Sequence, residues 1–66
     1  MDALPPVADR LRGTALHREQ LRDEGYRDTQ LRAAVRAGEV EVLRRAWFVA
    51  RDAPHELREA ARRGGR

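Results

Sequence analysis

The chain has 66 residues, no cysteine, and a net charge of +3 from 14 arginines, no lysine and 11 acidic residues. A chain this short forms one domain with a thin core, and without cysteine it has neither disulfides nor thiolate metal sites. No apolar run approaches the roughly 18 residues of a membrane span. The acidic start does not resemble a signal peptide, so we expect a cytoplasmic location.

The exclusive use of arginine has two compatible explanations. GC-rich codon usage favours arginine, and the planar guanidinium also suits contacts to phosphate and guanine. A charge of +3 is modest for a protein that binds nucleic acid, so the decisive question is whether the basic residues gather on one face. The two histidines stand apart from other ligands, so we expect neither a metal nor a cofactor.

The first part of the chain predicts two short helices. One is expected over residues 4–12, whose apolar residues recur at helical spacing: Leu4, Val7, Ala8 and Leu11. Pro5 and Pro6 suit its first turn, and Gly13 ends it. The second is expected over residues 17–24 and is followed by Gly25, a residue typical of the left-handed position after a helix.

The third helix, expected over residues 28–37 and ended by Gly38, has the clearest pattern. Asp28 can cap its start and complements the helix dipole. Its buried stripe consists of Leu31, Ala34 and Val35. Two helices joined by a tight glycine turn are typical of a helix-turn-helix.

The hydrophobic period then changes from helical to alternating over residues 39–50. Glu39 to Val42 alternates polar with apolar residues, and Trp47 to Ala50 is aromatic and β-branched. This predicts a β-hairpin, although its turn, Arg44-Arg45-Ala46, lacks the usual Asn-Gly or Asp-Gly.

A last helix is expected over residues 53–63, with Leu57, Ala60 and Ala61 on one face and Arg58, Arg62 and Arg63 opposite. The glycine pair Gly64-Gly65 follows it. We therefore expect a mostly α fold with a small β-hairpin. The element order predicts one winged helix-turn-helix domain over residues 1–66, with three helices, a two-stranded wing and a C-terminal helix.

Residues 17–50 resemble the N-terminal winged-helix domain of the AbiEi-type antitoxins of type IV toxin–antitoxin systems, a domain also found ahead of Vsr-like endonuclease domains in actinobacterial proteins. The matching motifs are Arg18 to Leu21, Gly25-Tyr26, Leu31 to Val35, Arg36-Ala37-Gly38 and Arg44-Arg45-Ala46-Trp47-Phe48. The resemblance covers about half of the chain firmly and most of it loosely. It implies a winged helix that binds an operator, often to repress the protein's own operon.

Three departures from the family pattern affect what the resemblance implies. Ala46 stands where the family usually has glycine, which affects the hairpin turn. His17 and Arg27 stand where small hydroxyl residues commonly cap the two helices, so we expect weaker helix starts. Family members continue into a larger C-terminal region that neutralises the toxin or carries the endonuclease-like fold, so we assign neither activity to these 66 residues.

Ten residues are candidates for contact with DNA. Those in or just before the third helix are Arg27, Thr29, Gln30, Arg32, Ala33 and Arg36. Glutamine and arginine can read base edges when such a helix enters a major groove. Arg44 and Arg45 at the hairpin tip suit a backbone phosphate or a minor groove. Arg18 and Arg22, one turn apart on the second helix, suit the flanking backbone. The alternative interpretation of each set is an ordinary solvated, charged surface.

The aromatic residues predict a core rather than a site. Trp47 and Phe48 could stack on bases, but together with Tyr26 they are the only large aromatic residues that can fill the interior. Strand alternation lets only one of the adjacent pair point fully inward. His17, His55 and Glu56 form no recognisable catalytic motif, so we expect no enzymatic activity.

We expect sequence-specific binding of double-stranded DNA by a transcriptional repressor or antitoxin-like autoregulator. Strong operator binding by so small a module would need a homodimer and a repeated half-site. The alternative is a small phage- or prophage-type module that binds a host or partner protein through the C-terminal helix or an exposed aromatic residue, without DNA binding.

Overall fold

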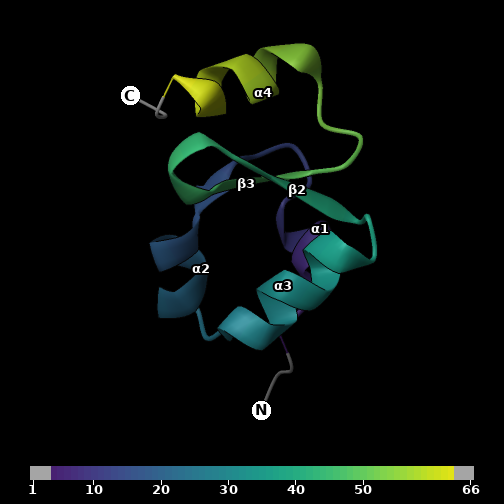
Figure 1. Ribbon diagram of the computed structural model, residues 1–66, viewed down its shortest axis with the longest axis vertical. Coiled ribbons are helices and arrows are strands. Elements are labelled where there is room, and N and C mark those ends of the chain that lie inside the picture. Colours follow the sequence, from purple (N-terminus) through teal and green to yellow (C-terminus); the bar gives the residue numbers. More distant parts are fainter. Residues whose placement is uncertain (1–3, 64–66) are drawn as a thin grey trace.

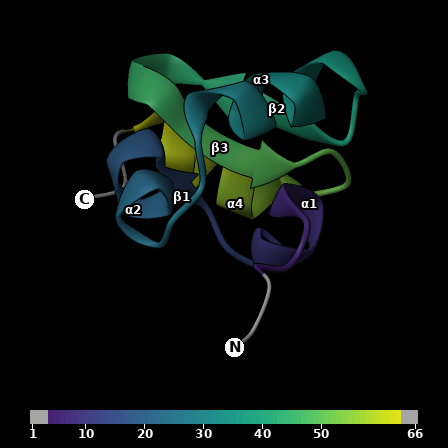
Figure 2. The same ribbon diagram turned by 90° about the horizontal axis from the view of Figure 1, so that it is seen from below.

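A computed structural model describes residues 4–63; residues 1–3 and 64–66, including the glycine pair expected after the last helix, lie outside the described part. The elements in chain order are α1 (Val7–Arg10), β1 (Leu16–His17), α2 (Arg18–Asp23), α3 (Asp28–Arg36), β2 (Val40–Leu43), a single 3₁₀ turn (Arg44–Ala46), β3 (Trp47–Ala50) and α4 (His55–Arg62). The sheet lies between two helical layers, with α1 and α3 on one face and α4 on the other (Figure 1). Viewed from the side of α1, α2 and α3, the same sheet hides much of α4 (Figure 2).

The sheet has three antiparallel strands in the order β1-β3-β2, not the two that the sequence predicts. The additional strand, β1, pairs Leu16 with Phe48 and His17 with Trp47. Two residues are too few to show an alternating pattern, so no local signal predicts β1. Its pairing places β3 at the centre of the sheet.

The first helix is shorter than residues 4–12, because α1 spans only Val7–Arg10. A residue that precedes proline is driven away from helical backbone angles, which excludes Leu4 and Pro5 from the helix. Pro6 itself is the N-cap residue of α1, with an extended ψ of 149°, and only flanks the helix. After Arg10 the chain turns toward Gly13, whose φ of 69° is left-handed.

The helices α2 and α3 begin with the same capping interaction, in which a glutamine side chain of the first turn accepts a hydrogen bond from the backbone N–H of the N-cap residue. The Gln20 Oε1 accepts a hydrogen bond from the backbone N–H of His17 at 2.8 Å, and the Gln30 Oε1 accepts one from that of Arg27, also at 2.8 Å. His17 additionally caps α2, because its Nδ1 accepts from the Glu19 N–H at 3.1 Å. Arginine has no acceptor to offer, so the start of α3 depends on Gln30 alone.

The hairpin turn between β2 and β3 contains two non-glycine residues with left-handed backbone angles. Arg45 has φ 59° and ψ 32°, and Ala46 has φ 64°. For residues with a Cβ atom, this region costs roughly 1–2 kcal/mol per residue. Ala46 therefore stores backbone strain that a glycine at this position would not have.

Strand alternation divides the apolar residues of the sheet between two small cores. Val40, Phe48 and Ala50 join the larger core, which contains Leu11, Leu21, Tyr26 and Leu31. Val49 points to the opposite face, where α4 covers it, and is fully buried, as is Ala61 of α4 at 1% exposure. Phe48 is 5% exposed while Trp47 is only partly buried, so one residue of this pair points fully inward, as predicted.

Candidate nucleic-acid interface

The outward side of α3 carries a row of small and basic side chains. Leu31 and Ala34 are buried against the rest of the protein, which fixes the orientation of the helix. The four residues Thr29, Arg32, Ala33 and Arg36, called the α3 row below, are exposed and line one shallow hollow of about 200 Å³. The row contains two guanidinium groups and no carboxylate.

A second hollow lies on the sheet side of α3. It measures about 210 Å³ and is lined by the charged residues Arg18, Asp28 and Arg32 and by the apolar residues Leu31, Val35, Val42 and Phe48. Arg32 belongs to both hollows, so it connects the α3 row with the start of α2 and with β2. Val42 is 48% exposed, which is unusual for a large apolar residue in this chain.

The arginines divide into two groups by their partners. Four of them contact carboxylates: Arg10 with Glu24 at 2.6 Å, Arg22 with Asp28 at 4.0 Å, Arg62 with Glu59 at 3.5 Å, and Arg58 with Glu41. Within residues 4–63, no carboxylate oxygen lies within 4.0 Å of the guanidinium groups of the other nine arginines, Arg12, Arg18, Arg27, Arg32, Arg36, Arg44, Arg45, Arg51 and Arg63. Six of the ten candidate residues are therefore arginines without an internal acidic partner.

Two of the paired arginines change the acidity of their partners. The hydrogen bond from Arg10 lowers the pKa of Glu24, and the hydrogen bond from Arg58 lowers the pKa of Glu41. The same contacts raise the pKa values of both arginines. Burial raises the pKa of the Tyr26 hydroxyl, which donates a hydrogen bond to the carbonyl oxygen of Pro5 at 2.6 Å.

Six of the ten candidates lie outside the α3 row, and among these Arg22, Gln30 and Arg27 line neither of the two hollows described above. Arg22 lines a separate hollow with Glu19 and Asp23, and it approaches Asp28. Gln30 lies on the side of α3 that faces the N-terminal segment, where it lines a hollow with Pro5 and Tyr26. Arg27 directly precedes α3 and is exposed.

Arg44 and Arg45 lie exposed in the turn between β2 and β3. Their turn begins directly after Leu43, two residues beyond Val42, and Val42 lines the second hollow together with Arg32. The candidates that lie near Arg32 therefore come from the α3 row, the start of α2 and the hairpin turn, whereas Arg22, Arg27 and Gln30 lie apart from them.

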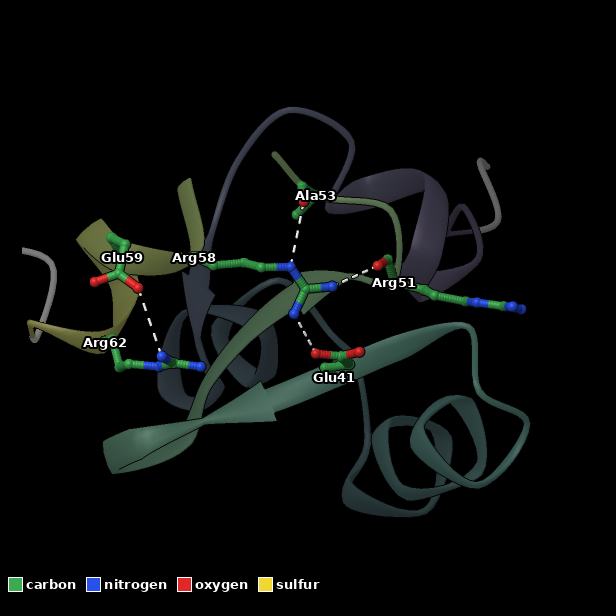
Figure 3. Close-up of polar contacts among 6 residues, drawn as sticks. All are labelled: Glu41, Arg51, Ala53, Arg58, Glu59 and Arg62. Atoms are coloured by element: carbon green, nitrogen blue, oxygen red, sulfur yellow. Dashed lines mark hydrogen bonds and ion pairs between the residues drawn. The ribbon is translucent and has the colours of Figure 1, made fainter. Parts of the chain in front are cut away.

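Arg58 is a residue whose role the sequence pattern did not predict. We expected it on the open face of the last helix, but its guanidinium points toward the sheet (Figure 3). Its Nε donates to the carbonyl of Ala53 at 3.2 Å, and its two terminal nitrogens donate to the Glu41 carboxylate and to the carbonyl of Arg51. Arg58 thus connects α4 to β2 and to the loop after β3. No local signal predicts contacts between elements this far apart in sequence.

The remaining polar residues of interest do not form a cluster. His55 is exposed and lies 3.8 Å from Glu59 on the same helix, whereas His17 caps α2 and packs edge-to-face on Trp47 with ring centres 5.5 Å apart. Within residues 4–63, no three His, Cys, Asp or Glu side chains are arranged to hold a metal ion. Ala60, expected on the packed side of α4, is exposed.

Comparison of the chain with protein-family models, with curated proteins and with solved structures found no match. None of the helices in the described part of the chain has the length and hydropathy that crossing a bilayer requires.

Proposed function

We propose that this protein binds double-stranded DNA with α3 in a major groove. The observation that carries the proposal is the α3 row: Arg32 and Arg36 project from a helix whose other side is fixed in the core, and neither has an acidic partner within residues 4–63. Surface arginines without such partners can bind phosphates or base edges without first breaking an internal ion pair.

The dimensions of α3 support this docking. With its side chains an α-helix is about 10–12 Å across, which fits the roughly 12 Å width of the major groove, and α3 provides nine residues. Exposed Ala33 adds little bulk between the two arginines, which supports a close approach of the helix to the base edges. In the same arrangement, Arg44 and Arg45 contact the flanking backbone.

A winged helix-turn-helix is the fold that we propose for this function. The helices α2 and α3 with their short Gly25 turn serve as the helix-turn-helix, and the β2–β3 hairpin serves as the wing. The resemblance of residues 17–50 to AbiEi-type antitoxins supports the same interpretation. On this basis the protein acts as a repressor or autoregulator that occupies an operator, and a homodimer on repeated half-sites supplies the affinity that one small module lacks.

The alternative, a protein-interaction module that acts through the last helix, has less support. The apolar side of α4 already packs against the sheet and is not free for a partner, because Ala61 is 1% exposed and Leu57 is partly buried. Arg58, which we expected to be free, is held by Glu41 and two backbone carbonyls.

Fluorescence anisotropy with a labelled duplex over a series of salt concentrations tests the proposal. If the charges of Arg32, Arg36, Arg44 and Arg45 together release the counterions of about four phosphates, whether each guanidinium meets a phosphate or a base edge in the groove, log Kd varies with log salt with a slope of magnitude about 3.6. The double variant Arg32→Ala/Arg36→Ala should reduce this magnitude to about 1.8.

The matched control is Arg62→Ala/Arg63→Ala, which removes the same charge from the C-terminal end of α4 and its C-cap, on the opposite face of the sheet. Its slope should equal that of the wild type. If both double variants reduced the slope by the same amount, only the net charge of the protein would matter, and α3 would not be the binding surface. If the wild type did not bind the duplex at low salt, the proposal would be rejected altogether.

A further inference from the structure

The hydrogen bond between the Arg27 N–H and the Gln30 side chain, which caps the start of α3, affects which bases the helix can contact specifically. Gln30 is the residue of α3 best suited to adenine, because a glutamine pairs with adenine by accepting from N6 through its oxygen and donating to N7 through its nitrogen. That pairing requires both atoms of the carboxamide to face the same base edge.

In this protein the Gln30 oxygen already has a partner. It accepts from the Arg27 N–H at 2.8 Å, and the orientation of the carboxamide is fixed by chemistry, since only the oxygen can accept from an N–H. The Arg27 side chain cannot replace this cap, because a guanidinium has no acceptor. Pairing with adenine through both atoms would therefore require the Gln30 oxygen either to leave the cap or to accept with its second lone pair while the cap holds the carboxamide at the start of α3.

The other outward residues of α3 are also mostly donors. Arg32 and Arg36 only donate, Ala33 offers a methyl group, and Thr29 alone can both donate and accept. Asp28, the only acidic residue of α3, lies one turn before Arg32 and lines the second hollow together with it; its carboxylate approaches Arg22 at 4.0 Å and is not among the residues of the α3 row. The α3 row thus offers donors almost exclusively.

We infer that the preferred target presents guanines to α3 in the major groove. Guanine is the base with two adjacent acceptors there, N7 and O6, and the two-pronged guanidinium matches them. Arg32 and Arg36 lie four residues apart, one helical turn, so they contact successive positions along the groove. This inference rests on the proposed DNA binding and adds its base preference.

The test compares guanine with 7-deazaguanine in one duplex that contains a run of four guanines. This replacement removes the N7 acceptor and keeps the base pairing and the phosphate charge. We expect Kd to rise about fivefold or more, the loss typical of one specific base contact. A second duplex with 7-deazaadenine in place of its adenines should bind as tightly as its unmodified form.

The variants Arg32→Lys and Arg36→Lys identify the residues responsible. Lysine keeps the positive charge but lacks the planar fork, so the slope of log Kd against log salt should stay unchanged while the effect of 7-deazaguanine shrinks. The control Arg62→Lys should keep both the slope and the deazaguanine effect.

The outcomes separate this inference from the proposed function. If binding were tight and salt-dependent but neither modified base changed Kd, the proposed DNA binding would stand and the guanine preference would be overturned. An equal loss with 7-deazaadenine would also overturn it, because it would show that adenine is read as well. Failure to bind any duplex at low salt would overturn both.

Discussion

The left-handed backbone of Ala46 makes a measurable prediction about stability. At φ 64° the Ala46 Cβ atom crowds the backbone, at a cost of roughly 1–2 kcal/mol that glycine does not incur. Glycine in turn loses about 0.5–1 kcal/mol through the greater freedom of the unfolded chain. The variant Ala46→Gly should therefore be more stable than the wild type by about 0.5–1 kcal/mol.

Thermal unfolding followed by circular dichroism measures this difference. For a domain of this size, each kcal/mol shifts Tm by about 4–8 °C, so Ala46→Gly should raise Tm by about 2–8 °C. The matched control is Ala33→Gly, which makes the same chemical change at an exposed position inside α3, where the backbone is helical. Glycine there should cost about 1 kcal/mol and lower Tm.

The two variants must therefore change stability in opposite directions. A decrease in Tm for Ala46→Gly similar to that for Ala33→Gly would refute the reasoning, because it would mean that residue 46 occupies an ordinary backbone region. Chemical denaturation gives a second measure, in which the slope against denaturant should stay unchanged and only the midpoint should move.

Two further predictions concern polar contacts. Tyr26→Phe removes the hydrogen bond to the Pro5 carbonyl and should lower the free energy of unfolding by about 0.5–1.5 kcal/mol, as measured by urea denaturation; an unchanged midpoint would contradict the importance of this bond. The second prediction concerns pH: because the pKa of Glu41 is lowered in the folded protein by Arg58, its contribution to stability is present above its ordinary pKa and is lost as the pH falls through the folded value. Glu41→Gln should therefore reduce the loss of stability on acidification, and Glu24→Gln should do the same for the separate pair at the N-terminal side; acid titrations of Tm that match the wild type would refute both.

The sequence predicts the parts of the fold that have a local hydrophobic period. The stripe of Leu31, Ala34 and Val35 is sufficient to place α3, and the change to alternation after Glu39 is sufficient to place the hairpin. The strand β1 has no period of its own, and it exists because Leu16 pairs with Phe48, a partner that no local pattern identifies. Long-range pairing of this kind is set by tertiary packing rather than by propensity.

The candidate site shows the same division. The exposed side of α3 follows from helical spacing once its buried stripe is known, so the α3 row is predictable. The hydrogen bond between the Gln30 side chain and the Arg27 N–H was also predictable from the sequence, because His17 and Gln20 show the same three-residue spacing at the start of the preceding helix. The inward position of Arg58 was not, since its partners lie in β2 and in the loop after β3.

The central position of β3 has a consequence for the order in which the molecule folds. The helices α2 and α3 and the hairpin are made of neighbouring residues, so they can form early and at little cost in loop closure. In contrast, β1 must wait for β3, and the chain between them contains α2, α3 and β2. Closure of β1 onto β3 is thus the most non-local step in the sheet, and we expect it to be formed late, after the helix pair and the hairpin have brought Leu16 and Phe48 within reach of each other.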